Sequence, residues 1–333
     1  MSFDQVLLNA KNVITTKDKN NITPTPIIKH VKNPLTERLI KKPDLLPNDD
    51  VIDFITIATL GNALDFGDLT SQNGNKGTAA SSPTRYVFHT QNNSNATIDF
   101  GTIAAKGNST RFGDYISGGP GHPAAALLRC CSNQTRAVFA GGYLLISPYG
   151  FVTSQMGDIT IASEGNATVF GDLTIARYGM NATSNQVRGI FAGGDTYNHN
   201  NRTDRIEFVT ISTTGNSTDF GNLTSSRAMI GGASNSTRGL FFGGFTPSHS
   251  NTIDFITIAT TGDATDFGDL ITGRSRGCAA ASSTRGITEG GSPGTNSIEF
   301  VEIATTGNAV DFGDGNGSGN SGAAACSNGH GGL

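Results

Sequence analysis

Residues 252–269 read T-I-D-F-I-T-I-A-T-T-G-D-A-T-D-F-G-D, and this stretch returns almost unchanged at two other places in the chain. Residues 51–68 read V-I-D-F-I-T-I-A-T-L-G-N-A-L-D-F-G-D, and residues 297–314 read S-I-E-F-V-E-I-A-T-T-G-N-A-V-D-F-G-D. The phrase around the central phenylalanine recurs, with variation, at Phe66, Phe112, Phe170, Phe220, Phe267 and Phe312. Recurrence at intervals of 45 to 58 residues indicates a repeat architecture rather than a set of unrelated domains.

Each unit has the pattern of four short strands. Residues 253–258, Ile-Asp-Phe-Ile-Thr-Ile, are β-branched or aromatic at most positions, which favours a strand. The Thr-Gly-Asp that follows predicts a tight turn, and residues 264–270 predict the returning strand. A run of small residues comes next, as at residues 279–281, and then a strand that opens with Arg285 and ends at a glycine pair. Four antiparallel strands in about 47 residues is the size of one propeller blade.

The apolar residues fall on both faces of the predicted strands. A sheet with one face in water alternates cleanly between apolar and polar residues, whereas a propeller blade packs both faces against its neighbours. The small-residue strand fits the narrow centre of such a ring. We therefore predict an all-β fold, a six-bladed β-propeller closed by the partial blades at the two ends of the repeat. One strand of the closing blade is then either missing or donated by the N-terminal segment.

The repeat divides the chain into an arm and a ring. Residues 1–50 contain no repeat and carry five prolines, which disfavour long helices, so they are predicted to form an extended N-terminal arm. Residues 51–333 are predicted to form the propeller. Its repeat units are expected near residues 51–96, 97–150, 151–204, 205–251, 252–296 and 297–333.

Two interpretations of the arm remain open. It is either a disordered leader or an extended segment that becomes ordered by docking on a neighbouring subunit. In the second interpretation, its apolar patches are the candidate partner contacts: Leu7, Leu8, Ile27 and Ile28.

Composition argues against several classes of function. The net charge is −4, so the whole chain lacks the basic character of a nucleic-acid-binding protein. No apolar run approaches the roughly 18 residues that a membrane span requires, and the first residues do not have the pattern of a secretory signal. The four cysteines show neither zinc-ligand spacing nor a disulfide framework. We expect no nucleic acid, membrane or cofactor among its partners.

An acidic residue recurs near the start of each unit. The members are Asp53, Asp99, Glu207, Asp254 and Glu299, and the third unit has Gly157 at this position with Asp158 next to it. Six acids around a channel could bind cations, but a repeated acid can equally serve in a turn or a salt bridge, and we predict no metal site. The repeated arginines are expected to pair with backbone or with the repeated aspartates; they are Arg85, Arg136, Arg188, Arg238 and Arg285.

No motif of a known catalytic site is present. The six histidines share no position in the repeat, and the chain has no nucleophile elbow or phosphate-binding loop. We therefore predict no catalytic residues and a protein that is not an enzyme.

The most apolar predicted loop follows Gly142. It carries Tyr143, Leu144, Leu145, Tyr149 and Phe151. Such a loop either packs over the rim of a blade or contacts another subunit, because a large exposed apolar patch is unusual in an isolated protein. We take these residues as candidate partner contacts.

A glycine pair that ends one strand, a strand hairpin and a small-residue strand with a nearby arginine resemble the kelch repeat, over residues 51–333. The diagnostic tryptophan of kelch motifs is replaced by the phenylalanine of Asp-Phe-Gly-Asp. The wording of the repeat is similar to kelch-like repeats in structural proteins of tailed bacteriophages, notably those infecting marine cyanobacteria.

That resemblance implies a virion component, a structural protein of the tail or an appendage that binds other virion proteins in a symmetric assembly. A receptor- or glycan-binding adhesin of the host surface is the first alternative, and a capsid decoration protein is the second. An adhesin site is expected to gather aromatic residues on one face of the ring, but the chain has six tyrosines and no tryptophan.

Overall fold

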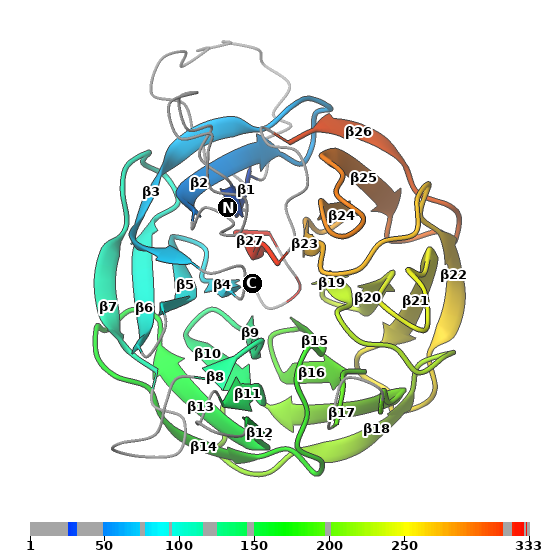
Figure 1. The fold of residues 1–333 in the computed structure, drawn as a ribbon, viewed down its shortest axis with the longest axis horizontal. Coiled ribbons are helices and arrows are strands. Elements are labelled where there is room, and N and C mark those ends of the chain that lie inside the picture. Colours follow the sequence, from blue (N-terminus) through cyan, green and yellow to red (C-terminus); the bar gives the residue numbers. More distant parts are fainter. Residues whose placement is uncertain are drawn as a thin grey trace.

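The structure is a computed structural model, and it describes residues 26–31, 49–73, 77–92, 95–115, 125–144, 150–196, 201–315, 322–329 and 331. Throughout these ranges the regular elements are β-strands, which form six four-stranded antiparallel sheets and one small three-stranded sheet. Figure 1 shows the sheets arranged around a central axis, like the blades of a propeller. The prediction of an all-β, propeller-like fold is confirmed.

The six large sheets follow one another along the chain and are called sheets 1 to 6 here. From the axis outward, sheet 1 is β27 (Ala325–Ser327), β1 (Pro26–Val31), β2 (Asp49–Thr56) and β3 (Leu64–Asn73). Sheet 2 is β4 (Thr78–Ser81), β5 (Arg85–Asn92), β6 (Asn95–Thr102) and β7 (Thr110–Asp114). Sheet 3 is β9 (Arg129–Ser132), β10 (Arg136–Ala140), β13 (Gln155–Thr160) and β14 (Thr168–Asp172).

The second half of the ring has the same plan. Sheet 4 is β15 (Asn181–Ser184), β16 (Arg188–Ala192), β17 (Arg205–Thr210) and β18 (Thr218–Asn222). Sheet 5 is β19 (Gly231–Ser234), β20 (Arg238–Phe242), β21 (Thr252–Thr257) and β22 (Thr265–Asp269). Sheet 6 is β23 (Cys278–Ala281), β24 (Arg285–Glu289), β25 (Ser297–Glu302) and β26 (Val310–Asp314). The three-stranded sheet is β8 (Ala125–Ala126), β11 (Tyr143–Leu144) and β12 (Phe151–Val152).

The inner strands form a closed circle. Each packs against the inner strand of the next sheet, in the order β4, β9, β15, β19, β23 and β27, and β27 returns to β4. Small residues predominate in these strands, as the taper of a propeller requires. The ring therefore has no open end between its first and last sheets.

The ring is closed by both ends of the chain. Strand β1 lies between β2 and β27 and is paired antiparallel to both of them. Residues 26–31 belong to the segment that the sequence assigns to the arm, so sheet 1 begins well before the repeat at residue 51. Of the two alternatives for the closing blade, the structure shows the second, in which the N-terminal segment donates the strand.

The recurrent Phe-Gly explains how neighbouring sheets join. Phe267 lies at a β-bulge in β22, is only 2% exposed and meets the Phe255 ring edge-on at 5.8 Å. Its carbonyl accepts a hydrogen bond from the amide of Gly307 in the next sheet, at 2.8 Å. A Cβ on Gly268 would lie 2.4 Å from the Gly307 carbonyl oxygen, so a side chain is excluded there. The equivalent backbone bond recurs at all six junctions of the ring.

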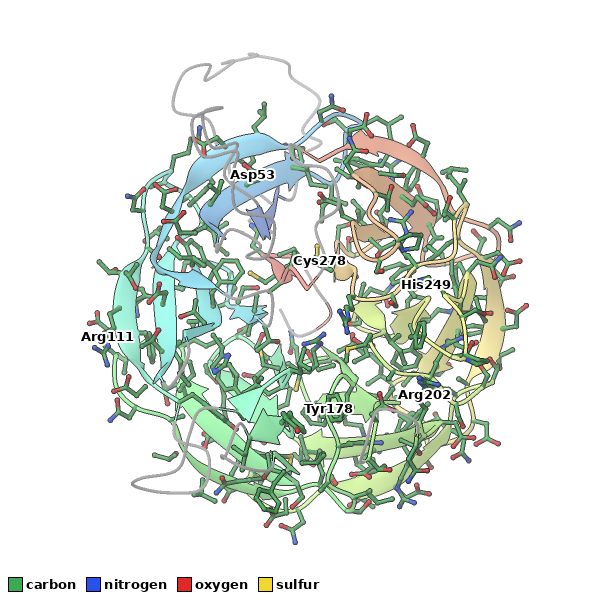
Figure 2. The ribbon with its side chains drawn as sticks, viewed as in Figure 1. Asp53, Arg111, Tyr178, Arg202, His249 and Cys278 are labelled. Carbon is green, nitrogen blue, oxygen red and sulfur yellow. The ribbon has the colours of Figure 1, made fainter. Side chains whose placement is uncertain are left out.

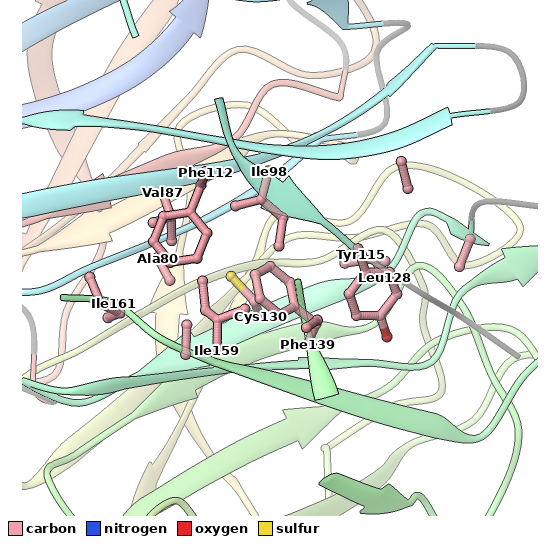
Figure 3. Packing of buried hydrophobic residues seen from close by; sticks show 14 of the residues in the cluster. Ala80, Val87, Ile98, Phe112, Tyr115, Leu128, Cys130, Phe139, Ile159 and Ile161 are labelled. Carbon is pink, nitrogen blue, oxygen red and sulfur yellow. The ribbon is translucent and has the colours of Figure 1, made fainter. Parts of the chain in front are cut away.

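The core lies between the sheets rather than within one of them. In the cluster between sheets 2 and 3, Ile98 and Phe112 of one sheet pack with Phe139 and Ile159 of the next (Figure 3). All four are buried. Because each sheet is covered on both faces, its strands are apolar on both faces, as the sequence predicts.

Candidate functional site

The recurrent acids connect neighbouring sheets. Asp254 on β21 is fully buried, and its carboxylate accepts hydrogen bonds from the amide and the hydroxyl of Thr224, at 3.1 and 2.7 Å. Arg227 donates to the same carboxylate at 2.7 Å, and its side chain is also fully buried. Thr224 and Arg227 follow the outer strand of sheet 4, so the acid ties the chain between sheets 4 and 5 to the interior of sheet 5.

Two other recurrent acids, Glu207 and Asp99, show how hydrogen bonds and burial act on the pKa of these carboxyl groups. Burial raises the pKa of Glu207, but the Arg177 charge and hydrogen bonds from Ser217 and Thr174 outweigh this effect and hold the pKa below its ordinary value. Asp99 has hydrogen bonds from Thr70, but burial dominates and its pKa is raised. These acids are parts of the joints between sheets.

In the described part of the chain, no three His, Cys, Asp or Glu side chains are placed to hold a metal ion. Sequence reasoning missed the arginines that partner these acids. Arg177, Arg227 and Arg274 are among the largest fully buried side chains. Each stands seven residues after a repeat phenylalanine, and that spacing is the signal that could have found them.

The repeated arginines join neighbouring sheets through backbone carbonyls. Arg238 donates from Nη1 to the carbonyl oxygens of Ile303 and Ala304 on the next sheet, at 2.8 and 2.9 Å. The four other arginines donate to the equivalent isoleucine carbonyl at 3.0 to 3.2 Å. In sheet 1 the corresponding position is held by Pro26, which pairs with Thr56. Of the two expected partners, backbone and aspartate, backbone is therefore the one that recurs around the ring.

A circle of serine hydroxyls surrounds the axis. Each hydroxyl donates to a carbonyl on the inner strand of the preceding sheet, four of them at 2.7 to 2.9 Å. The pairs are Ser81 to Ser327, Ser132 to Ser81, Ser184 to Ser132, Ser234 to Ser184 and Ser327 to Ala281.

The serine circle is interrupted once. Sheet 6 has Ala281 at the serine position, so the carbonyl of Ser234 receives no hydroxyl from sheet 6. That carbonyl accepts instead from the backbone amide of Gly331, at 2.8 Å. Gly331 thus connects the C-terminal segment after β27 in sheet 1 to β19 in sheet 5, and both strands lie near the centre of Figure 1.

The central channel is narrow. Its cavity of about 50 Å³ is lined by residues such as Ala80, Ala182 and Ala280 from the inner strands. Binding sites for small organic molecules measure roughly 300 to 1,000 Å³, so the channel has room for little more than water. Cys130, Cys131 and Cys326 line it, and these three and Cys278 are buried and without disulfide bonds.

The apolar loop after Gly142 contributes β11 and β12 to the three-stranded sheet, and β8 completes it. Tyr143 is half-buried and meets the Tyr178 ring at 5.5 Å, and Leu144 is buried. Phe151 is 52% exposed. Leu145 and Tyr149 lie outside the described residues. Packing over the rim therefore accounts for Tyr143 and Leu144, whereas Phe151 has the exposure that a partner contact needs.

Of the candidate partner contacts in the arm, the structure describes the backbone of two. Leu7 and Leu8 lie outside the described residues. The backbones of Ile27 and Ile28 are in β1, opposite Ile55 and Phe54 of β2. Their main chains thus belong to the ring.

The strand pairing of the three-stranded sheet recurs, in shorter form, at the neighbouring sheets. In each case the residue after the glycine pair bridges two other segments. The bridges are Ala126–Tyr143–Val152, Tyr178–Asp195–Arg202 and Ala228–Phe245–His249. Sheet 6 has the shorter pair Ser275–Ser292. These bridges build an additional layer on one end of sheets 3 to 6.

A cavity of about 420 Å³ lies within this layer, between sheets 4, 5 and 6. Sheet 4 contributes Asp195 and Arg202, and sheet 5 contributes Met229, Phe245 and His249. Sheet 6 contributes Ser275 and Arg276. Figure 2 labels Arg202 and His249, which lie on the same side of the ring. Sequence reasoning did not single out this site, because its residues come from three separate repeats.

The side chains of the cavity hold one another in place. The Arg202 guanidinium lies 4.8 Å above the Phe245 ring, and its Nε is 3.9 Å from Asp195 Oδ1. The His249 ring meets Phe245 at 5.3 Å, and its Nδ1 is 3.1 Å from Ser275 Oγ. The cavity thus combines an aromatic surface with fixed cationic and hydroxyl groups, an arrangement suited to binding a small polar molecule.

No family model matches the sequence, and no curated protein matches it. Within the part of the chain that the structure describes, there is no helix long and apolar enough to cross a membrane.

Proposed function

We propose that the six sheets are the blades of a kelch-type propeller and that the protein is a non-enzymatic structural component of a phage virion. In this role it belongs to the tail or an appendage and binds other virion proteins in a symmetric assembly. The kelch and phage parts of the proposal rest on the resemblance of the repeat, in particular I-D-F-I-T-I-A-T-T-G and T-R-G-x-F-x-G-G. The architecture is compatible with that resemblance.

The observation that carries the assembly role is the position of β1. Its six residues pair with Val51–Thr56, and three of them pair with β27 on the other side. Residues 1–25 are therefore joined to the ring through a strand bonded on both edges. A partner that bound Leu7 and Leu8 would hold the entire ring.

The contacts between neighbouring sheets suit a protein that has to withstand mechanical force. Backbone bonds link the sheets at every junction, and the arginine contacts and buried acid contacts reinforce them. Contacts that are distributed evenly around a closed ring resist its opening at any one seam. A rigid body carrying a partner-binding arm is what an assembly module needs.

The adhesin is the second candidate. The cavity between sheets 4, 5 and 6 favours it, because a ligand site on one face of the ring is what receptor recognition requires. The capsid decoration role remains an alternative location for the same assembly function.

Two truncations test the assembly proposal. A chain that starts at Pro26 keeps β1, so we expect it to fold with the thermal midpoint of the full chain but not to enter purified particles. A chain that starts at Asp50 loses β1 and leaves β27 without its partner strand, so we expect a lower thermal midpoint as well. Normal incorporation of the Pro26 chain would refute the role of residues 1–25 and leave the exposed Phe151 region as the attachment site.

Detection of the protein in particles tests the virion assignment directly. Mass spectrometry of purified particles should find the full-length chain at a constant ratio to the major capsid protein. Its absence from particles would refute the virion role.

A further inference from the structure

We propose that the cavity between sheets 4, 5 and 6 is a binding site for a small organic anion, specifically a sugar that carries a carboxylate. This inference goes beyond the assembly role and does not depend on it. It rests on the charge of the cavity, the unpaired guanidinium of Arg276 and the size of the cavity.

The charge of the cavity is positive although the chain as a whole is negative. Arg202 and Arg276 line it, and Asp195 is the acidic residue opposite them. Asp195 is buried and lies 3.9 Å from Arg202, so its charge offsets one guanidinium. No second acidic residue of the cavity lining offsets the charge of Arg276, although the net charge of the chain is −4. A carboxylate is the natural partner of a guanidinium, because its two oxygens match the fork of N–H donors.

The backbone conformation at Arg276 does not require an arginine. Its φ is +60°, in the left-handed region that L-residues rarely adopt, and the equivalent positions carry glycine at 179 and 322 and Leu127 and Met229 elsewhere. The conformation is held by hydrogen bonds from the Arg276 amide to the Met229 carbonyl and from the Gly322 amide to the Arg276 carbonyl. Glycine would satisfy the same bonds without strain. The fold therefore does not explain the arginine.

The Arg276 side chain is also available. It is exposed, and its guanidinium makes no hydrogen bond or ion pair with the residues that the structure describes. Met229, which lines the same cavity, has the second left-handed backbone there, with φ of +56°. Leu127, at the equivalent position outside the cavity, has a φ of +56° as well, so the left-handed backbone belongs to the repeat and the unpaired guanidinium is what distinguishes Arg276.

The other walls fit the body of a sugar. Phe245 is partly buried and contributes an apolar surface, and Ser275 and His249 place a hydroxyl and an imidazole beside it. Sugars bind through a combination of apolar C–H surface and hydroxyl groups, so both kinds of wall are needed. A volume of about 420 Å³ accommodates a monosaccharide, which the central channel of about 50 Å³ cannot.

The first experiment compares ligands on the full-length protein. Isothermal titration calorimetry with glucuronate, glucose and inorganic sulfate separates recognition of the sugar acid from recognition of a sugar or a charge alone. We expect glucuronate to bind at least tenfold more tightly than glucose or sulfate. Absence of glucuronate binding at millimolar concentration would overturn the proposal, and so would equal affinity for sulfate or for glucose.

The second experiment separates binding from folding. Arg276→Gly removes the guanidinium but places the favoured residue at a left-handed position, so we expect the thermal midpoint to stay the same or rise. Glucuronate affinity should fall at least tenfold. Arg111→Ala is the matched control, because this exposed arginine lies on the outer strand β7, at a different part of the ring (Figure 2). Unchanged glucuronate affinity in Arg276→Gly would overturn the assignment.

Discussion

Replacing Arg238 by alanine should weaken the seam between sheets 5 and 6. The guanidinium donates to the carbonyls of Ile303 and Ala304 at 2.8 and 2.9 Å and lies 4.8 Å above the Phe255 ring. A hydrogen bond from a charged donor contributes about 1.5 kcal/mol at the lower end of its range, which suits a partly exposed side chain. A partly exposed cation–π contact adds about 0.5 kcal/mol. Two such hydrogen bonds and the cation–π contact together predict that Arg238→Ala lowers the free energy of unfolding by about 3.5 kcal/mol.

Urea unfolding followed by circular dichroism measures this loss. With a denaturant slope of about 3 kcal/mol/M, the midpoint should shift down by about 1 M. Arg111→Ala is the control, because its ion pair with Asp114 is exposed on both sides and should contribute at most about 1 kcal/mol. If Arg238→Ala shifts the midpoint no more than Arg111→Ala does, the arginine contacts are not what stabilises the seam.

Three further predictions concern the core, the pH response and the axis. Phe267→Ala should destabilise the ring by about 3–5 kcal/mol, measured by urea unfolding, because it empties a buried aromatic site; an unchanged midpoint would contradict this. Burial lowers the pKa of His89 to about 4 from 6.5, so stability should fall by up to about 3 kcal/mol as the pH drops from 6.5 to 4. His89→Phe should remove most of that dependence in thermal unfolding; an identical pH profile in the variant would assign it to other groups. Ala281→Ser adds the absent hydroxyl and should compete for the Ser234 carbonyl, seen as faster hydrogen exchange of the Gly331 amide; unaltered exchange would show that the carbonyl accommodates both donors.

The ring was predictable because its decisive contacts repeat. Phe267 and its equivalents recur, each followed by glycine. At each junction the aromatic side chain fills the space between two sheets, and the glycine leaves room for the neighbouring backbone. The closing strand was harder to place. Residues 26–31 carry no repeat, since β1 is recruited by backbone pairing with β2 and β27, and backbone pairing leaves little trace in side-chain patterns.

The role of the acids was only partly predictable. A recurrent acid such as Asp254 is visible in the sequence, but cation binding and hydrogen bonding require the same carboxylate. Which of these two roles the carboxylate takes depends on the groups that face it. For Asp254 these are Arg227 and Thr224, which come from the preceding sheet. The two partners stand about 30 residues before the acid, so local pattern does not reveal them.

The sequence repeat by itself was enough to predict the all-β, propeller-like class of fold and the apolar faces of the strands, because these depend on contacts that each unit makes in the same way. Tertiary structure alone decided how the ring closes, where the serine circle is interrupted at Ala281, and that Arg202, Phe245 and Arg276 line one cavity. Those features join segments from different units at places where the units differ. A site of this kind exists only once the closed ring holds three sheets side by side.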